Sequence, residues 1–127
     1  MSERMVSIAW IAFTSLLGVA GQTVAKVGLS RLALSPSLQA SDVGRMLGSP
    51  LVWCGGTLLV LGTVLWFHVL SKVEFSVAMP VGSLLQLVLS VAAARVCFGE
   101  SLPTVRWIGF TLAMVAVWLI ASPAPRA

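Results

Sequence analysis

Four long runs without a charged side chain dominate this sequence, and their lengths restrict the folds open to it. The runs cover Met5–Ala25, Met46–Ser71, Phe75–Ala94 and Trp107–Pro125. The hydrocarbon core of a bilayer is about 30 Å thick, and an α-helix needs about 20 residues to cross it. Each run reaches that length or falls short of it by about one residue. The sequence therefore predicts four membrane-spanning helices.

The composition favours the same fold class. Hydrophobic residues make up 58% of the chain and charged residues only 9%, whereas soluble domains carry about 25% charged residues. Backbone groups cannot stay unpaired in lipid, and the runs lack the alternation of barrel strands, so helices are expected. We predict an all-α integral membrane protein with a single transmembrane domain, residues 1–127. Its four transmembrane helices are expected at about 5–28, 50–71, 75–98 and 104–121.

The connections between the runs differ in length. The longest polar stretch is Ser30–Pro50, in which Leu38–Leu47 is a candidate for a short interfacial helix. Lys72–Glu74 joins the second and third spans so closely that a tight antiparallel hairpin is expected. Pro80 lies inside the third span, where its missing N–H loosens the helix and provides a candidate hinge.

Small and polar side chains recur every four residues in the first and third spans, on one face of each helix. The two seams are Thr14, Gly18, Gln22 and Lys26 in the first span, and Gly82, Gln86, Ser90 and Ala94 in the third. Two interpretations are open. The seams either hold helices together through close approach and amide hydrogen bonds, or form the polar lining of a pathway for a lipid headgroup.

Basic side chains gather at the end of the bundle where the first and third spans terminate. This end has a net charge of +3, against +1 at the other end. Its basic residues are Lys26, Arg31, Arg45, Arg95 and Arg106. They form either a phosphate-binding rim or a set of helix-end cations that extend into the interface. The weak excess of basic residues at this end places both chain termini outside.

Glu100 follows Gly99 in the turn before the last span. One expectation is pairing with Arg95, Arg106 or a loop amide, and the other is proton coupling or recognition of an aminosugar. Arg95 lies nine positions from Gln86, on the opposite face of an ideal helix.

Features of catalytic and metal sites are missing from the sequence. It contains one histidine, one aspartate, no C-x-x-C pair, no P-loop and no carboxylate pair within a run, so we expect neither an enzyme nor a cofactor or metal. Cys54 and Cys97 are interpreted as two buried thiols. No basic and aromatic stripe typical of nucleic-acid binding is present, so the net charge of +4 favours contact with anionic lipid.

Three stretches carry a resemblance to a known family. They are Ser15–Lys26, with its G-Q-x-x-x-K pattern, Trp66–Pro80, and Phe98–Pro103, which is followed by R-W-I-G-F. In order and spacing they resemble the small four-helix members of the drug/metabolite transporter superfamily, a sister group of the small multidrug resistance exporters. The closest likeness is to the subunits that flip aminoarabinose-phosphoundecaprenol across the bacterial inner membrane.

The resemblance implies a drug/metabolite-transporter-like bundle in the bacterial inner (cytoplasmic) membrane. It implies a multi-pass flippase for a polyprenyl-phosphate-linked sugar or a related anionic lipid, as in lipopolysaccharide modification. It also implies a homodimer, or a heterodimer with a similar small subunit. Gln22, Lys26, Pro80 and Glu100 match the family's motifs, while Met79 stands where relatives often have tyrosine. The substrate-binding candidates are Gln22, Lys26, Arg31, Gln86, Arg95 and Glu100, with Pro80 as the hinge.

Two other functions stay open at this point. A small multidrug or metabolite exporter has the same size, although Gly18 stands where those exporters carry a membrane-embedded glutamate. A non-transporting scaffold subunit of a membrane complex is the other alternative.

Overall fold

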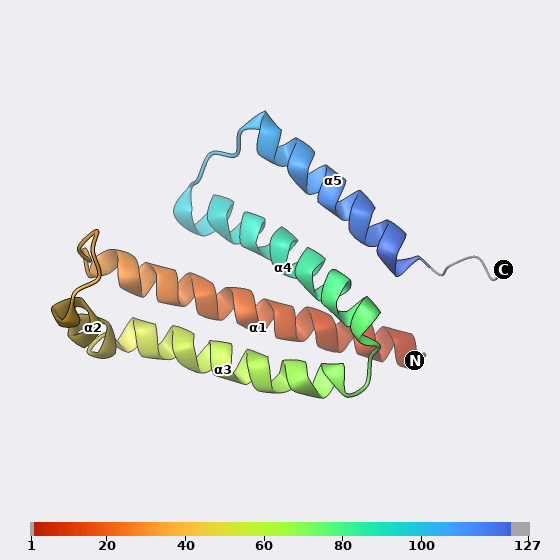
Figure 1. Cartoon of the computed structure of the whole chain (residues 1–127), viewed down its shortest axis with the longest axis horizontal. Coiled ribbons are helices and arrows are strands. Elements are labelled where there is room, and N and C mark those ends of the chain that lie inside the picture. Colours follow the sequence, from red (N-terminus) through yellow and green to blue (C-terminus); the bar gives the residue numbers. More distant parts are fainter. Residues whose placement is uncertain (1, 123–127) are drawn as a thin grey trace.

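The computed structural model describes residues 2–122, and all regular secondary structure in that range is helical (Figure 1). The helices are α1 (Glu3–Arg31), α2 (Ala40–Leu47), α3 (Pro50–Leu70), α4 (Phe75–Phe98) and α5 (Thr104–Ala121). The all-α class predicted from the sequence is confirmed.

Three of these helices, α1, α3 and α4, are long and apolar enough to cross a membrane, with 29, 21 and 24 residues. Their length and composition point to a membrane protein. Helix α5 is apolar but has only 18 residues, which corresponds to about 27 Å at the usual helical rise. The presence of a fourth span therefore stays a prediction.

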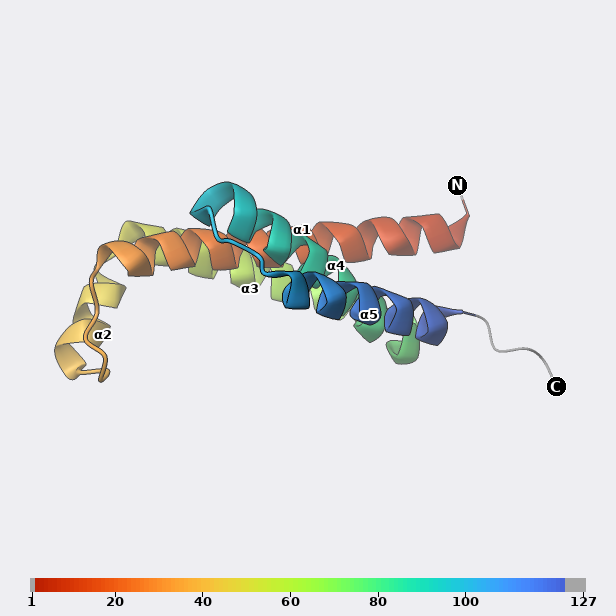
Figure 2. The same cartoon turned by 90° about the horizontal axis from the view of Figure 1, so that it is seen from above.

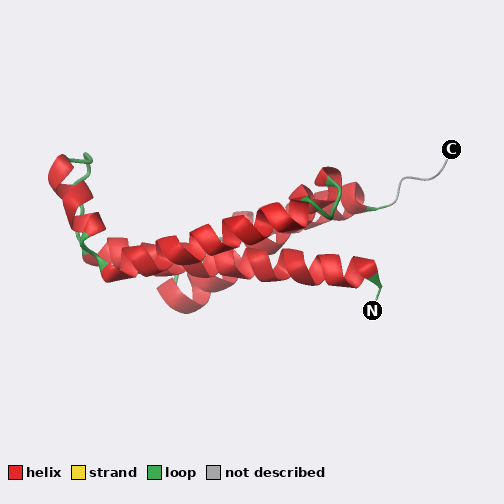
Figure 3. Cartoon of the chain, turned by 90° about the horizontal axis from the view of Figure 1, so that it is seen from below, coloured by secondary structure: helices red, strands yellow, loops and turns green. Residues whose placement is uncertain are grey.

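Glycines bring α1 and α3 together as a close antiparallel pair that extends along most of the molecule (Figures 1 and 3). A Cβ atom built on Gly55 would lie 2.6 Å from the Ala25 backbone nitrogen and 2.7 Å from the Gly21 carbonyl oxygen. A Cβ on Gly28 would lie 2.9 Å from the Leu51 Cβ. The two backbones thus approach so closely that only glycine fits, a common way of joining helices where hydrophobic driving force is weak.

Helix α4 packs mainly against α1 and α5 and has little contact with α3 (Figures 1 and 2). The tight packing expected between the second and third long helices is therefore wrong, although the turn between them is short. The physical reason is that α1 already occupies the glycine-rich face of α3. One contact across the pair is close: a Cβ on Gly82 would lie 2.7 Å from Cη2 of Trp66.

The interior of this arrangement is small. The buried hydrophobic side chains within residues 2–122 are Ile11, Val19, Val69 and Ala78. No residue of α5 is buried over Thr104–Ile120, and its large apolar side chains are exposed. Such outward apolar surface suits a helix in lipid, where burial in protein is not needed to remove it from water.

Helix α2 folds back at the end of α1 and is fixed there by two charged side chains. Asp42 is buried and accepts a hydrogen bond from the Gln39 backbone N–H at 3.2 Å. The Arg45 guanidinium lies 3.8 Å from Asp42 and donates to the Leu32 carbonyl oxygen. The candidate interfacial segment 38–47 is thus helical from Ala40 to Leu47.

Both cysteines are free and exposed, so the interpretation of Cys54 and Cys97 as buried thiols is wrong. Cys54 immediately precedes Gly55, whose side of α3 faces α1, and the thiol is therefore left on the outer surface. Cys97 lies in the last turn of α4. In a bilayer, such positions face lipid or the interface.

Candidate functional site

The polar seams of α1 and α4 face each other across a groove. Its first part is a cavity of about 180 Å³ bounded by α1, α3 and α4. The polar and small residues lining it are Thr14, Gly18, Gln22, Gly62, Thr63 and Gln86. A Cβ on Gly18 would lie 3.5 Å from the Gln86 amide nitrogen. The Gln86 amide of α4 thus lies against the backbone of α1 at Gly18, and an added Cβ would only reach ordinary van der Waals contact with it.

The second part of the groove is a neighbouring cavity of about 160 Å³ between α1 and α4. Gln22 lines both cavities. The other polar or aromatic residues of the second cavity are Thr23, Lys26, Ser90 and Phe98. The seam that the sequence predicts on α1 therefore lies along the two cavities in order, from Thr14 to Lys26.

The two glutamines are exposed. Neither amide makes a side-chain hydrogen bond with another residue in the range 2–122. The packing interpretation of the seams expects hydrogen bonds between amides, which these glutamines do not form, and close approach at small residues, which is present where Gly82 meets Trp66. In the isolated chain, Gln22 and Gln86 instead present unused donors and acceptors to the groove.

Lys26 closes the polar end of the groove through contacts with the α4–α5 turn. Its Nζ donates to Glu100 Oε1 at 2.7 Å and lies 4.2 Å from the centre of the Phe98 ring. The backbone at Gly99 has φ 59°, which glycine adopts without strain, and the Glu100 N–H donates to the Ala94 carbonyl at 3.1 Å. This helix end aims Glu100 at Lys26, so the expected ion pair with Arg95 or Arg106 is wrong.

The Lys26–Glu100 pair remains accessible to water, with 56% of the lysine side chain and 39% of the glutamate side chain exposed. The hydrogen bond and charge of Lys26 lower the pKa of the Glu100 carboxyl below its ordinary value of 4.5, and the charge of Arg106 contributes in the same direction. Glu100 is therefore ionised at neutral pH. Because the pair is not enclosed, another anion can reach the Lys26 ammonium.

The remaining predicted cations are placed elsewhere. Arg31 and Arg95 are exposed, and neither lines the two cavities. The structure therefore brings together Gln22, Lys26, Gln86 and Glu100, but leaves these two arginines outside the groove. Arg95 is nine residues from Gln86, and this spacing turns it to the other side of α4.

A third hollow, of about 610 Å³, separates α4 from α5. Its lining is mostly apolar, and its two charged residues are Glu100 and Arg106. Ser90 and Ala94 line both this crevice and the second cavity. One stretch of α4 thus has a polar groove on one side and an apolar crevice on the other.

Sequence reasoning missed the aromatic residues of the site, Phe98 and Trp66. Phe98 stands two residues before Glu100, and this spacing could have drawn attention to it. Trp66 lines the first cavity and covers Gly82, a contact between helices that no local pattern encodes.

Helix α4 continues through the candidate hinge Pro80, where the missing N–H leaves the Ser76 carbonyl without its usual helical donor.

Comparison with protein-family models, curated proteins and solved structures found no match. Within residues 2–122, no group of three or more histidine, cysteine, aspartate or glutamate side chains is placed to hold a metal ion.

Proposed function

We propose that this protein is a transporter or flippase that moves a polyprenyl-phosphate-linked sugar, or a related anionic lipid, across the bacterial inner membrane. The observation that carries the proposal is the groove between α1 and α4, in which accessible glutamine amides lead to the Lys26 ammonium. A polar track in an apolar bundle is costly unless it has a function. The family resemblance of the sequence supports the same substrate class.

In the proposed mechanism, the lipid phosphate replaces the Glu100 carboxylate as the partner of Lys26. Phosphate oxygens accept strong charge-assisted hydrogen bonds from an ammonium. The hydroxyl groups of the sugar then exchange hydrogen bonds with Gln22, Gln86 and Ser90 along the groove. These side chains bind and guide the headgroup, and no covalent step is needed.

The apolar part of the substrate has a separate place in this proposal. The crevice between α4 and α5 is mostly apolar and begins beside Glu100. A prenyl chain lying there stays in contact with the bilayer while its headgroup occupies the polar groove on the other side of Ser90 and Ala94. Pro80 weakens α4 near its start and serves as the hinge for the opening of the groove.

A second subunit completes the proposed pathway. The two cavities measure about 180 and 160 Å³, whereas sites for small molecules commonly measure about 300–1,000 Å³. One copy of the chain thus offers only part of a headgroup site. A homodimer, or a heterodimer with a similar small subunit, encloses the exposed groove.

Transport in proteoliposomes tests the proposal. Wild-type protein should increase the transfer of a fluorescent polyprenyl-phosphate sugar between leaflets, and Lys26→Gln should abolish the increase. Arg95→Gln is the matched control, because it removes a nearby cation that lines neither cavity. Equal activity of wild type and Lys26→Gln would refute the assignment.

The alternatives predict other results. A small multidrug exporter should move cationic dyes, yet neither cavity is lined by an acidic residue. A non-transporting scaffold subunit should retain full function when Gln22 and Lys26 are both replaced by apolar residues. The same proteoliposomes distinguish these functions.

A further inference from the structure

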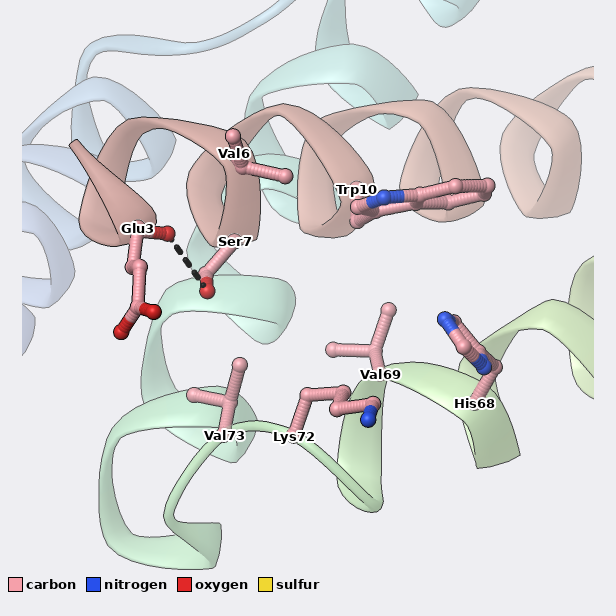
Figure 4. A pocket seen from close by; sticks show the side chains of 8 residues that line it. All are labelled: Glu3, Val6, Ser7, Trp10, His68, Val69, Lys72 and Val73. Carbon is pink, nitrogen blue, oxygen red and sulfur yellow. Dashed lines mark hydrogen bonds between the residues drawn. The ribbon is translucent and has the colours of Figure 1, made fainter. Parts of the chain in front are cut away.

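A pocket of about 380 Å³ lies at the opposite end of the bundle from Lys26, between the first turns of α1 and the end of α3 (Figure 4). Its polar and aromatic residues are Glu3, Ser7, Trp10, His68 and Lys72, and three valines complete the lining. Glu3 and Lys26 belong to the same helix and are about 35 Å apart along it. The pocket is thus separate from the groove, at the other membrane surface if α1 spans the bilayer.

The charged groups of this pocket are not neutralised by one another. Neither Glu3 nor Lys72 belongs to the ion pairs found within residues 2–122, which are Lys26–Glu100 and Arg45–Asp42. Both side chains line the same pocket, with Glu3 toward one end and His68 toward the other (Figure 4). The pocket therefore offers an acceptor for a cation and donors for an anion at the same time.

Trp10 packs against His68 at the end of the pocket opposite Glu3. Its ring meets the His68 imidazole edge-on, with the ring centres 5.5 Å apart and the planes at 63°. The indole N–H of Trp10 makes no hydrogen bond with the rest of the described chain. Together with the Lys72 ammonium and the imidazole, it gives the pocket lining three nitrogen groups that can donate hydrogen bonds.

We propose that this pocket binds a zwitterionic group with an ammonium and a phosphate, such as the headgroup of phosphatidylethanolamine. The ammonium pairs with the Glu3 carboxylate, and the phosphate accepts hydrogen bonds from Lys72, His68 and Trp10. The volume falls within the range of small-molecule sites, about 300–1,000 Å³. The valines and the indole face support the uncharged carbons between the two ends. This site does not depend on the function proposed for the groove.

Native mass spectrometry of the full-length protein tests the site with defined lipids. Phosphatidylethanolamine should bind about tenfold more tightly than phosphatidylglycerol, which has the phosphate but no ammonium. Glu3→Gln should remove this preference, while Lys72→Gln should weaken the binding of both lipids. Glu74→Gln and Arg4→Gln are the matched controls, since neither residue lines the pocket, and both should behave as wild type.

Soluble phosphoethanolamine distinguishes the two sources of the ligand. Displacement of the bound lipid by phosphoethanolamine supports a site that takes the free compound as well, and failure to displace it supports a site for the lipid headgroup alone. The inference is overturned if wild-type protein binds both lipids equally. It is also overturned if Glu3→Gln leaves the preference for phosphatidylethanolamine unchanged. Either result leaves the proposal for the Lys26 groove unaffected, because the groove is lined by other residues and is tested by transport, not by the lipid preference of this pocket.

Discussion

Replacing Gly55 by alanine should loosen the α1–α3 pair on which the groove is built. The added Cβ would lie 2.6 Å from the Ala25 nitrogen and 2.7 Å from the Gly21 carbonyl oxygen. Non-bonded atoms of this kind prefer separations of about 3.5–4.0 Å, so the helices would have to move apart by about 1 Å. Both opposing atoms belong to the backbone and cannot rotate away.

Overpacking of this kind costs about 1–3 kcal/mol. Alanine also gains up to about 1 kcal/mol over glycine in helix propensity, which partly offsets the cost. Gly56→Ala is the matched control, because a Cβ there has no atom within 4 Å and the propensity gain is the same. The difference between the two variants should therefore be about 1–3 kcal/mol, or about five- to 150-fold in the unfolding equilibrium constant.

The assay is reversible unfolding in mixed micelles by titration with sodium dodecyl sulfate, followed by circular dichroism. Gly55→Ala should unfold at a lower fraction of the denaturing detergent than Gly56→Ala. If Gly55→Ala is as stable as Gly56→Ala, the close approach of α1 and α3 does not exist in the folded protein, and the reasoning fails.

Three further predictions concern single contacts. Lys26→Gln should raise the pKa of the Glu100 carboxyl toward 4.5 in a carbon-13 NMR titration, because Lys26 lowers it. A midpoint unchanged in Lys26→Gln would contradict the ion pair. Because folding lowers the pKa of Glu100, the stabilisation by the ion pair is present above pH 4.5 and is lost as the pH falls through the lowered pKa. Gly82→Ala should shift the NMR signal of the Trp66 indole N–H, since the new Cβ would lie 2.7 Å from the indole ring, and a signal at the wild-type position would be inconsistent with this contact. Asp42→Ala should speed amide hydrogen exchange in α2 by up to about tenfold, because it removes the acceptor of the Gln39 N–H, while the exchange of α3 should stay the same.

Much of the fold follows from patterns within single helices. The apolar runs indicate where the long helices lie, and the four-residue spacing from Thr14 to Lys26 indicates a polar face on α1. Pro50 begins α3 as a proline at the first helical position should. Such features depend on neighbours along the chain, so a sequence is sufficient to predict them.

Features that depend on the rotation and pairing of helices were not predictable in the same way. Glu100 pairs with Lys26, 74 positions away, while two arginines nearer in sequence do not form the pair. Cys54 is exposed because the adjacent Gly55 faces α1, a one-residue difference that hydropathy does not resolve. The weak packing of α4 against α3 likewise depends on which glycines lie at contacts between helices. Several helices of this chain carry glycines, so the sequence does not show which pair packs closely.

The most direct test of the account is to locate the bound lipid phosphate by photo-crosslinking. The purified protein is incubated with a polyprenyl phosphate that carries a diazirine next to the phosphate, irradiated and analysed by peptide mass spectrometry. We predict labelling of the α1 peptide that contains Lys26 and of the α4 peptide that contains Phe98, with loss of both labels in Lys26→Gln. Absence of labelling from both peptides, or labelling that persists unchanged in that variant, would contradict the proposal.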